Sequence, residues 1–351
     1  MDRVIAAVDA FRRGRPVVVA GTGGPIVARA LETLDGSALA QLKRRGRARL
    51  VLSHARARTL KIRLYTADVV ALAVPRDIDL GTLRAIADPT DDLAYPLKGP
   101  FDTLRGSLPQ AYAASVKLAK LAGLLPATVV EAVRPAPKGA VALKAADILA
   151  YDEEIVRTLR IVARARVPLE GAEKTELVSF RPMDGGPEHY AIVIGAPPTA
   201  KPVLTRLHSE CFTGDLLGSL KCDCGTQLRG AIETIARAGG GVLLYLAQEG
   251  RGIGLINKLR AYRLQDQGFD TIDANERLGF EADERQYGLA ARMLSLLGYR
   301  SVRLLTNNPD KVAALKAAGV KVAGRVPHAF PDNEHNRAYL HTKASRAGHF
   351  L

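Results

Sequence analysis

LHSECFTGDLLGSLKCDCGTQL, residues 207–228, is the stretch on which the C-terminal half of this sequence converges. It contains all three cysteines of the chain, Cys211, Cys222 and Cys224. An odd number of thiols spaced C-x10-C-x-C does not suit a disulfide framework, whereas cysteine thiolates are common zinc ligands. The spacing therefore predicts one zinc ion per chain, bound by these three side chains.

Two kinds of zinc site fit the three cysteines. His208 lies three residues before Cys211 and could complete a closed Cys3His site with a structural role. Alternatively, water takes the fourth position and the ion acts as a Lewis acid. More polar residues crowd the cysteines than a structural site requires, which favours the catalytic kind. They are Arg206, Glu210, Asp215 and Gln227.

Length and composition indicate a globular protein of two domains. The chain has 351 residues, of which 47% are hydrophobic and 25% are charged. No apolar run approaches the ~20 residues that cross a bilayer. The N-terminal MDRVIAAVDAFRRGRP has the spacing of an amphipathic helix and lacks the basic start of a signal peptide. We therefore expect a cytoplasmic protein with no membrane partner.

The formal net charge of +14 raises the question of a polyanionic partner. Nucleic-acid-binding proteins commonly place aromatic side chains among their basic ones, but aromatic residues make up only 5% of this chain and tryptophan is absent. We therefore expect no nucleic-acid partner. A non-catalytic zinc module that binds nucleic acid is the alternative, and only the charge favours it.

The first ~150 residues alternate between strand and helix signals. Val17–Ala20 is predicted as an apolar strand. The glycine-rich residues 21–24 that follow it could cradle a phosphate, but they lack the lysine of a P-loop, so we expect a plain turn. Residues 113–125 have helical periodicity, with Gly123 near the helix end. These signals predict a mixed sheet packed against helices.

The residues that precede the cysteines predict strands. Thr175–Arg181 and His189–Val193 flank a turn at 183–187, which is typical of an antiparallel pair. Residues 202–208 form a further strand that leads to the cysteines. Residues 151–165 are expected to form a charged helical connector, and the domain boundary lies within it.

A glycine-rich loop, QEGRGIG at 248–254, follows a predicted buried strand at Val242–Leu246. Its alternating glycines allow a ligand to approach the backbone closely, and a helix at Leu255–Gln267 begins just behind it. A dinucleotide-binding loop is the alternative, since Asp273 lies about 20 positions further on. The G-x-G-x-G spacing and the ionic Glu-Gly-Arg sequence argue against it.

A strand, cap and helix near the C-terminus predict an anion site. Val302–Thr306 is an apolar strand, Asn308 is suited to cap the next helix with Pro309 in its first turn, and Gly319 follows its last turn. Lys311 lies at the helix start, where a cation is unfavourable to the helix dipole, so we expect an anion beside it. Residues 302–322 should form a βαβ-like unit.

The N-terminal half resembles 3,4-dihydroxy-2-butanone 4-phosphate synthase in the order of RRGRPVVV (12–19), ASVKLAKLAGLLPATVVEAV (114–133) and ALKAADILAYDEE (142–154). That family has an acidic run after its first strand and a His-Thr-Glu before its late helix. Here Gly21–Val27 and Ala111–Ala113 occupy those positions, and they cannot hold a divalent metal. We expect residues 1–155 to fold, to lack synthase activity and to serve in scaffolding or dimerisation.

The C-terminal half resembles GTP cyclohydrolase II from about residue 164 to the end of the chain. The resemblance rests on RLHSEC (206–211), GSLKCDCGTQL (218–228), QEGRGIGLINKLRAYRLQDQG (248–268), TIDANERLGFEADERQYG (271–288) and RLLTNNPDK (303–311). It implies that residues 156–351 use zinc, with Mg²⁺ on the triphosphate, to hydrolyse GTP to a diaminopyrimidine, formate and pyrophosphate. This reaction is the first step of riboflavin biosynthesis, and the resemblance also implies a homodimer.

The resemblance assigns roles residue by residue. Asp283 matches the proton acceptor, Tyr262 the tyrosine near the guanine, and Arg285 a proposed nucleophile toward the α-phosphate. A guanidinium with a pKa above ~12 is a poor nucleophile, so we expect Arg285 to clamp phosphate instead. Glu210 is a further candidate for proton transfer. The cysteines bind zinc, and the substrate contacts fall on Arg206, Leu207, His208, Ser209, Glu210, Gln227, Glu249, Gly250, Arg251, Thr271, Thr306 and Lys311.

Overall fold

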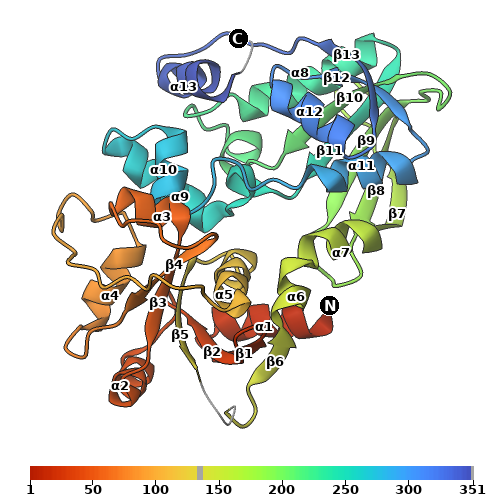
Figure 1. Cartoon of the computed structure of the whole chain (residues 1–351). Coiled ribbons are helices and arrows are strands. Elements are labelled where there is room, and N and C mark those ends of the chain that lie inside the picture. Colours follow the sequence, from red (N-terminus) through yellow and green to blue (C-terminus); the bar gives the residue numbers. More distant parts are fainter. Residues whose placement is uncertain (133–136, 349–351) are drawn as a thin grey trace. The chain divides into compact units, whose positions relative to one another are not determined.

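The computed structural model describes residues 1–132 and 137–348 and divides the chain into two compact units. The first unit comprises Met1–Tyr151 and Ile253–Glu284, and the second comprises Asp152–Gly252 and Arg285–Leu351. Each unit contains one mixed sheet with packed helices, which confirms the predicted fold class (Figure 1). Among the described helices, none is long and apolar enough to cross a membrane.

The first unit is built on a six-stranded sheet in the order β4-β3-β5-β2-β1-β6. Neighbouring strands are antiparallel except β1 and β6, which are parallel. Strand β1 coincides with the predicted Val17–Ala20. The strands are β1 (Val17–Ala20), β2 (Ile26–Ala30), β3 (Arg49–Ser53), β4 (Val69–Ala73), β5 (Ala127–Ala132) and β6 (Val141–Lys144).

The helices of the first unit come from two separate parts of the sequence. Asp35 caps α2 by accepting from the Ala38 N–H, and Gly46 ends it at a φ of 66°. The N-terminal helices are α1 (Asp2–Arg12), α2 (Gly36–Arg45), α3 (His54–Thr59), α4 (Leu80–Ala87), α5 (Gln110–Leu121) and α6 (Ala145–Leu149). The later part contributes α9 (Leu255–Asp266) and α10 (Thr271–Arg277).

The second unit is built on a seven-stranded sheet in the order β13-β12-β10-β11-β9-β8-β7. Strands β8 and β9 are antiparallel, as predicted, and β7 pairs antiparallel with β8, whereas β11, β10, β12 and β13 are parallel. The strands are β7 (Arg160–Arg166), β8 (Thr175–Arg181), β9 (His189–Gly195), β10 (Val203–Ser209), β11 (Gly240–Leu246), β12 (Ser301–Leu305) and β13 (Lys321–Val326). Because β12 and β13 are parallel across α12 (Pro309–Ala317), the predicted βαβ-like unit is confirmed.

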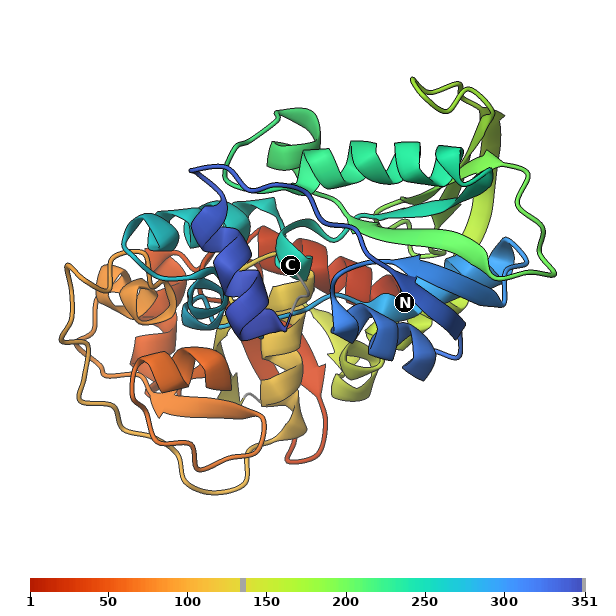
Figure 2. The same cartoon turned by 90° about the horizontal axis from the view of Figure 1, so that it is seen from above.

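Helices cover both faces of the parallel strands (Figure 2). Leu204, Leu243 and Leu305 are buried on the side of α8 (Cys224–Arg237). Their neighbours Val203, Leu244 and Leu304 are buried with residues of α11 (Tyr287–Leu296) and of α12. Successive strand residues point to opposite faces, so a sheet buried on both sides requires the continuous apolar runs that the sequence contains. Helix α13 (Arg337–Ala347) follows β13.

One predicted element is wrong in part. The connector is helical only as α7 (Tyr151–Thr158), and Arg160–Arg166 forms the edge strand β7 instead of continuing the helix. Six of its residues align with residues of β8. Pairing with a distant strand therefore overrides the local helical preference.

The units also differ from a single cut in the sequence. The predicted boundary at residues 155 and 156 assigns Ile253–Glu284 to the C-terminal domain, whereas this segment is compact with the N-terminal residues. Three predicted site residues, Tyr262, Thr271 and Asp283, belong to the segment.

Candidate active site

The parallel strands of the second unit bring three functional segments to one edge of the sheet. Cys211 follows the end of β10, Glu249 follows β11, and Thr306 follows β12. The carboxyl ends of neighbouring parallel strands lie at the same edge, which is where open α/β sheets bind ligands. Segments about 100 residues apart in the chain are therefore assembled by the topology.

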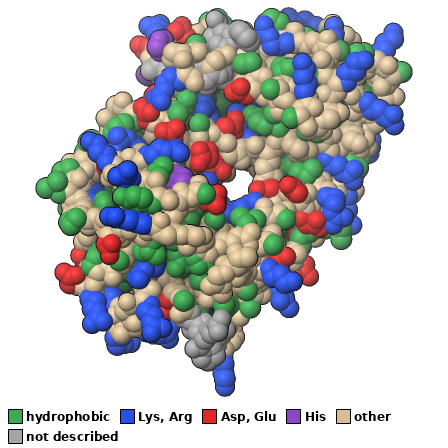
Figure 3. Space-filling view, in the orientation of Figure 1, with side chains coloured by type: hydrophobic (Ala, Val, Ile, Leu, Met, Phe, Trp, Pro, Cys, Tyr) green, Lys and Arg blue, Asp and Glu red, His purple; other side chains and the backbone are tan. Residues whose placement is uncertain are grey.

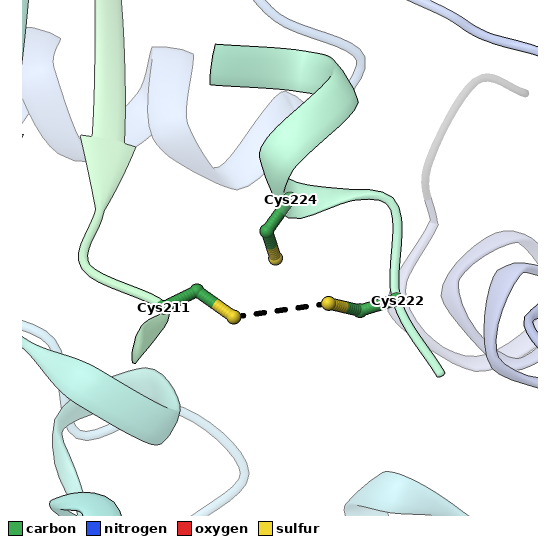
Figure 4. Close-up of side chains that lie close together, drawn as sticks. All are labelled: Cys211, Cys222 and Cys224. Atoms are coloured by element: carbon green, nitrogen blue, oxygen red, sulfur yellow. Dashed lines mark hydrogen bonds between the residues drawn. The ribbon is translucent and has the colours of Figure 1, made fainter. Parts of the chain in front are cut away.

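The three cysteines point toward one another at this edge (Figure 4). Their sulfur atoms lie within 4.8 Å of one another, and the distance between the Cys211 and Cys222 sulfurs is 3.7 Å. Contact with the Cys211 thiol raises the pKa of Cys222 to about 11, and contacts with the other two thiols raise the pKa of Cys224 well above its ordinary value. Three such thiols become thiolates when a cation compensates their charge.

Gly214 makes room for this cluster. It lies in the π-helical turn Phe212–Leu216, and its N–H donates to the Cys211 sulfur over 3.3 Å. A Cβ atom at this position would lie 2.7 Å from the Cys222 sulfur and 3.0 Å from the Cys211 sulfur. The backbone therefore forms a tight cradle around the thiols, and soft sulfur ligands in such a cradle fit zinc.

His208 does not join the cysteine cluster. Among the described residues, the ligand group consists of the three cysteines alone, and the Nε2 atom of His208 lies 3.1 Å from both carboxylate oxygens of Asp215. The ring of His208 also stacks on Tyr245 with 5.6 Å between centroids. This geometry favours the open three-thiolate site over the closed Cys3His alternative.

Asp215 connects the cysteine loop to two strands. One of its carboxylate oxygens accepts from the Cys211 N–H over 3.0 Å and from the Tyr245 hydroxyl over 3.0 Å. The same carboxylate contacts His208 of β10, and its side chain is only 7% exposed. Burial lowers the pKa of His208. The hydrogen bond to Asp215 and the charge of its carboxylate act in the opposite direction, but burial has the larger effect.

Arg206 of β10 is fully buried beside the site. Its guanidinium donates to the Leu305 carbonyl over 3.0 Å and to the side-chain oxygen of Gln227, which in turn donates to Asp223. Burial lowers the pKa of Arg206 to about 10, and the charge of Asp223 opposes it, so Arg206 remains a cation at neutral pH. Its buried Nε atom has no hydrogen-bond partner. Buried donors are usually hydrogen-bonded, so this N–H group is suited to an anionic ligand.

Two further cations lie on the same side of the second unit. Lys311 is buried, and its Nζ donates to the Leu207 carbonyl over 2.9 Å. This hydrogen bond holds the ammonium group at the end of β10. The charge of Arg285 contributes to the lowered pKa of Arg206, and the Arg285 guanidinium lies 5.4 Å from the Tyr287 ring centroid. Together with Arg206, these cations suit a phosphorylated ligand.

The predicted caps around Lys311 are confirmed. The Asn308 side chain accepts from the Asp310 N–H over 2.8 Å, Pro309 starts α12, and Gly319 adopts a φ of +84° after the helix. The buried Thr306 hydroxyl accepts from the Asn308 N–H over 3.0 Å.

The glycine-rich loop after β11 is strained and tied to the cysteine loop. Gly250 and Arg251 both have left-handed backbone conformations, with φ of 64° and 63°. For a residue with a side chain this costs ~1–3 kcal/mol, and such residues cluster at functional sites. Glu249 accepts from the Phe212 N–H over 2.6 Å. The Glu210 N–H donates to the Leu246 carbonyl over 2.8 Å, so the cysteine loop is also linked to the end of β11, directly before the glycine-rich loop.

The remaining predicted residues lie in the first unit. Tyr262 is on α9, where the Lys258 ammonium lies 5.6 Å from its ring centroid. Thr271 is the first residue of α10 and accepts from Gln265 over 3.1 Å. Asp283 is exposed and follows α10. The other predicted residues belong to the second unit, and they include the half-buried Ser209 at the end of β10.

Sequence analysis missed several buried polar residues that support the site. His189 accepts from the Ala247 N–H over 3.0 Å, and burial lowers its pKa to about 4, which keeps it neutral. His328 contacts the Gln227 carbonyl at 2.8 Å and exchanges two hydrogen bonds with Asn307. No local sequence pattern marks such residues, because their partners lie 21 to 101 positions away.

Comparison with known proteins shows the family of this chain. A family model described as GTP cyclohydrolase II matches residues 160–327. A curated GTP cyclohydrolase-2 from Azospirillum brasilense is 50% identical over 363 residues, which cover 100% of this chain and 94% of the relative. The chain belongs to the GTP cyclohydrolase II family. It is accordingly an enzyme, and its relative shares both halves of the sequence.

Other curated relatives match about half of this chain. GTP cyclohydrolase-2 from Histophilus somni (strain 2336) is 52% identical over 55% of this chain and 89% of its own length. Riboflavin biosynthesis protein RibBA from Bacillus mycoides (strain KBAB4) is 58% identical over 47% of this chain and 41% of its own length.

A solved structure of RibBX, a two-domain 3,4-dihydroxy-2-butanone 4-phosphate synthase from A. baumannii, aligns with 92% of this chain and 99% of its own at 18% identity. The TM-score of this alignment is 0.34.

Proposed function

We propose that this enzyme hydrolyses GTP by opening the imidazole ring of the guanine, and releases formate and pyrophosphate to leave a diaminopyrimidine nucleotide. The reaction would supply the first intermediate of riboflavin biosynthesis, the pathway that the name of the RibBA relative gives. The observation that carries the proposal is the three-thiol cradle next to the cations Arg206, Lys311 and Arg285 at one edge of the sheet.

Cys211, Cys222 and Cys224 would hold a zinc ion, one per chain. When bound, the ion supplies Lewis-acid activation of water, the chemistry that ring hydrolysis requires. The chain itself fixes the three sulfurs through the close approach of Gly214 and the carboxylate of Asp215 on the Cys211 N–H. Hydrogen bonds around metal ligands, such as the one from the Cys211 N–H to Asp215, orient the ligands and change the affinity for the metal.

The cations would bind the triphosphate, together with Mg²⁺. Arg206 offers a buried Nε donor without a partner, and Lys311 and Thr306 lie at the start of α12, where backbone N–H groups favour an anion. Arg285 would clamp the α-phosphate rather than attack it, because a charged guanidinium has no free electron pair for attack.

Three residues, Glu210, Asp283 and Tyr262, are proposed for proton transfer and for contact with the guanine. Glu210 follows β10 directly before Cys211, and its position next to the thiols suits proton transfer to or from water. Asp283 would act as the proton acceptor and Tyr262 would contact the guanine. The other proposed substrate contacts are Leu207, His208, Ser209, Gln227, Glu249, Gly250, Arg251 and Thr271.

GTP turnover by the zinc-loaded protein is the decisive test, with formate and pyrophosphate followed together. We expect equal release of both products, because Tyr262 and the three cysteines are all present. Release should be lost in Cys222→Ser and after removal of zinc with a chelator. Pyrophosphate without formate would contradict ring opening, and neither product would contradict the proposed function.

Nucleic-acid binding through a zinc module is the competing function. On the face in Figure 3, Lys and Arg side chains are interspersed with Asp and Glu. Salt-sensitive binding of RNA or DNA without GTP turnover would favour this competitor. We further propose that the enzyme acts in the cytoplasm as a homodimer and binds neither nucleic acid nor membranes.

A further inference from the structure

We propose that the N-terminal half of this chain is a platform that holds part of the GTP site in place. The inference rests on the proposed function. It concerns Ile253–Glu284, named here the α9–α10 segment, which lies inside the residues matched to the GTP cyclohydrolase II family. The segment carries Tyr262, Thr271 and Asp283, yet it is compact with residues of the N-terminal half.

The segment has only a small core of its own. Its buried apolar residues pack together with Leu125, which comes from the N-terminal half and completes the cluster. Gly279, at the end of the segment, lies so close to Ser53 and Pro126 that a Cβ atom there would be 2.9 Å from the Ser53 hydroxyl and 3.1 Å from the Pro126 ring. The members from the segment are Ile253, Ala261, Leu264, Ala274, Leu278 and Phe280.

A paired charge anchors the α9 helix close to Tyr262. The Arg260 guanidinium donates to both carboxylate oxygens of Glu32, over 2.8 and 3.2 Å. Glu32 also accepts from the Leu125 N–H over 2.9 Å, and Asn257, which is fully buried, donates to the Gly123 carbonyl over 3.2 Å. A two-point contact between Arg and carboxylate fixes orientation as well as distance.

A second anchor lies next to Asp283. The Lys120 ammonium of α5 contacts the carboxylate of Glu284 at 2.5 Å, and it also lies 5.8 Å from the ring centroid of Phe280. Both side chains are about four-fifths buried, at 23% and 20% exposed. The residue that follows the proposed proton acceptor is therefore bound to the N-terminal half.

A third anchor fixes the end of α10. Arg56 is 1% exposed and makes a two-point contact with Asp92, at 2.7 and 2.9 Å, while it donates to the Arg277 carbonyl over 3.4 Å. Gln267 donates to the Thr90 carbonyl over 2.9 Å. The anchors together bind both helices of the segment and the residues after them.

The platform gives the N-terminal half a role that needs no metal. It is a property of this chain rather than of every relative, because the Histophilus somni enzyme matches 55% of this chain with 89% of its own length and has little sequence left for such a half. Positioning alone is a large effect in enzymes, since a displacement of ~1 Å can cost ~10²-fold in rate.

Three full-length variants test the platform: Arg260→Gln, Glu32→Gln and Lys120→Met. We expect the KM for GTP to rise and kcat to fall, each about tenfold, while the zinc content stays at the wild-type value, because the cysteines lie in the other unit. Amide exchange of residues 253–284 should become faster, and that of residues 207–228 should not change. Arg260→Lys should restore part of the KM, since one ammonium replaces a two-point donor.

Arg45→Gln and Glu131→Gln are the matched controls. This ion pair, at 2.5 Å with Glu131 4% exposed, joins α2 to β5 within the same unit and does not touch the segment. The controls should keep wild-type KM and exchange.

Unchanged KM and unchanged exchange of residues 253–284 in all three variants would overturn the platform. A fall in kcat at constant KM, with faster exchange along the whole chain, would also overturn it, because that pattern indicates general destabilisation. If the wild-type protein releases neither formate nor pyrophosphate, the proposed function fails. The exchange data would then still decide by themselves whether the N-terminal half holds the segment.

Discussion

At the scale of single residues, Asp215 carries more of the site than its place in the sequence indicates. It accepts hydrogen bonds from the Cys211 N–H and the Tyr245 hydroxyl, and it contacts His208. Groups that orient metal ligands in this way commonly change metal affinity by ~10–100-fold when they are replaced. One buried carboxylate thereby connects a cysteine, a β10 residue and a β11 residue.

Asp215→Asn is expected to weaken zinc binding about tenfold. The amide has one acceptor oxygen instead of two, so its NH2 group faces donors and the buried partners lose hydrogen bonds. Competition with a chelating indicator would measure the affinity. Tyr245→Phe removes one partner only and should have a smaller effect; equal affinities for Asp215→Asn and the wild-type protein would contradict the role of Asp215.

At the scale of elements, the geometry of short turns decides where the sulfurs lie. The π-helical turn Phe212–Leu216 brings Gly214 against the thiols, and Gly225, near the start of α8, packs against the Gly214 backbone so closely that a Cβ atom would lie 2.3 Å from its carbonyl oxygen. The turn and the start of α8 therefore meet at two glycines, Gly214 and Gly225.

Gly214→Ala should abolish most zinc binding and reduce GTP turnover by more than tenfold. The added methyl group would lie 2.7 Å from the Cys222 sulfur and 2.9 Å from the Cys224 Cβ, so the ligands must move apart. Zinc content after dialysis measures the effect. Gly324→Ala on β13 is the matched control, because no atom lies within 4 Å of its added Cβ, and it should bind zinc normally. Normal zinc content in Gly214→Ala would contradict the claim that the backbone packs tightly around the thiols.

At the scale of the whole molecule, the N-terminal half keeps a sheet and helices but not the residues that a divalent metal needs. An added Cβ at Gly21 would lie 3.2 Å from the Ala145 Cβ and 3.6 Å from the Ala111 N atom, so the two segments that resemble the ligand positions of the synthase family do converge. In the described part of the chain, the one group of potential metal ligands is the cysteine cluster of the other unit.

We expect the purified protein to leave ribulose 5-phosphate unchanged in the presence of Mg²⁺. Alanine and glycine offer no ligand atom for the metal and no base for proton abstraction. The assay would follow formate and the butanone phosphate, beside an active synthase as the positive control. Formation of the butanone phosphate at a rate above the uncatalysed one would refute this prediction.

The sequence by itself determined the local elements and the chemistry of the site. Alternation of apolar residues predicted Thr175–Arg181 as a strand, and Asn308, Pro309 and Gly319 predicted the limits of α12, because caps and turns depend on neighbouring residues. The three cysteines predicted a metal site for a similar reason, because all of these ligands lie in one short stretch of the sequence.

Tertiary structure alone decided which distant segments share a surface. Arg160–Arg166 became a strand because β8 pairs with it, and Asp215 became a connecting residue because β10 and β11 present His208 and Tyr245 to it. The α9–α10 segment is compact with the N-terminal half through contacts such as Arg260 with Glu32, which are 228 positions apart. Contacts over such separations depend on the whole packing of the chain, and no local pattern of residues encodes them.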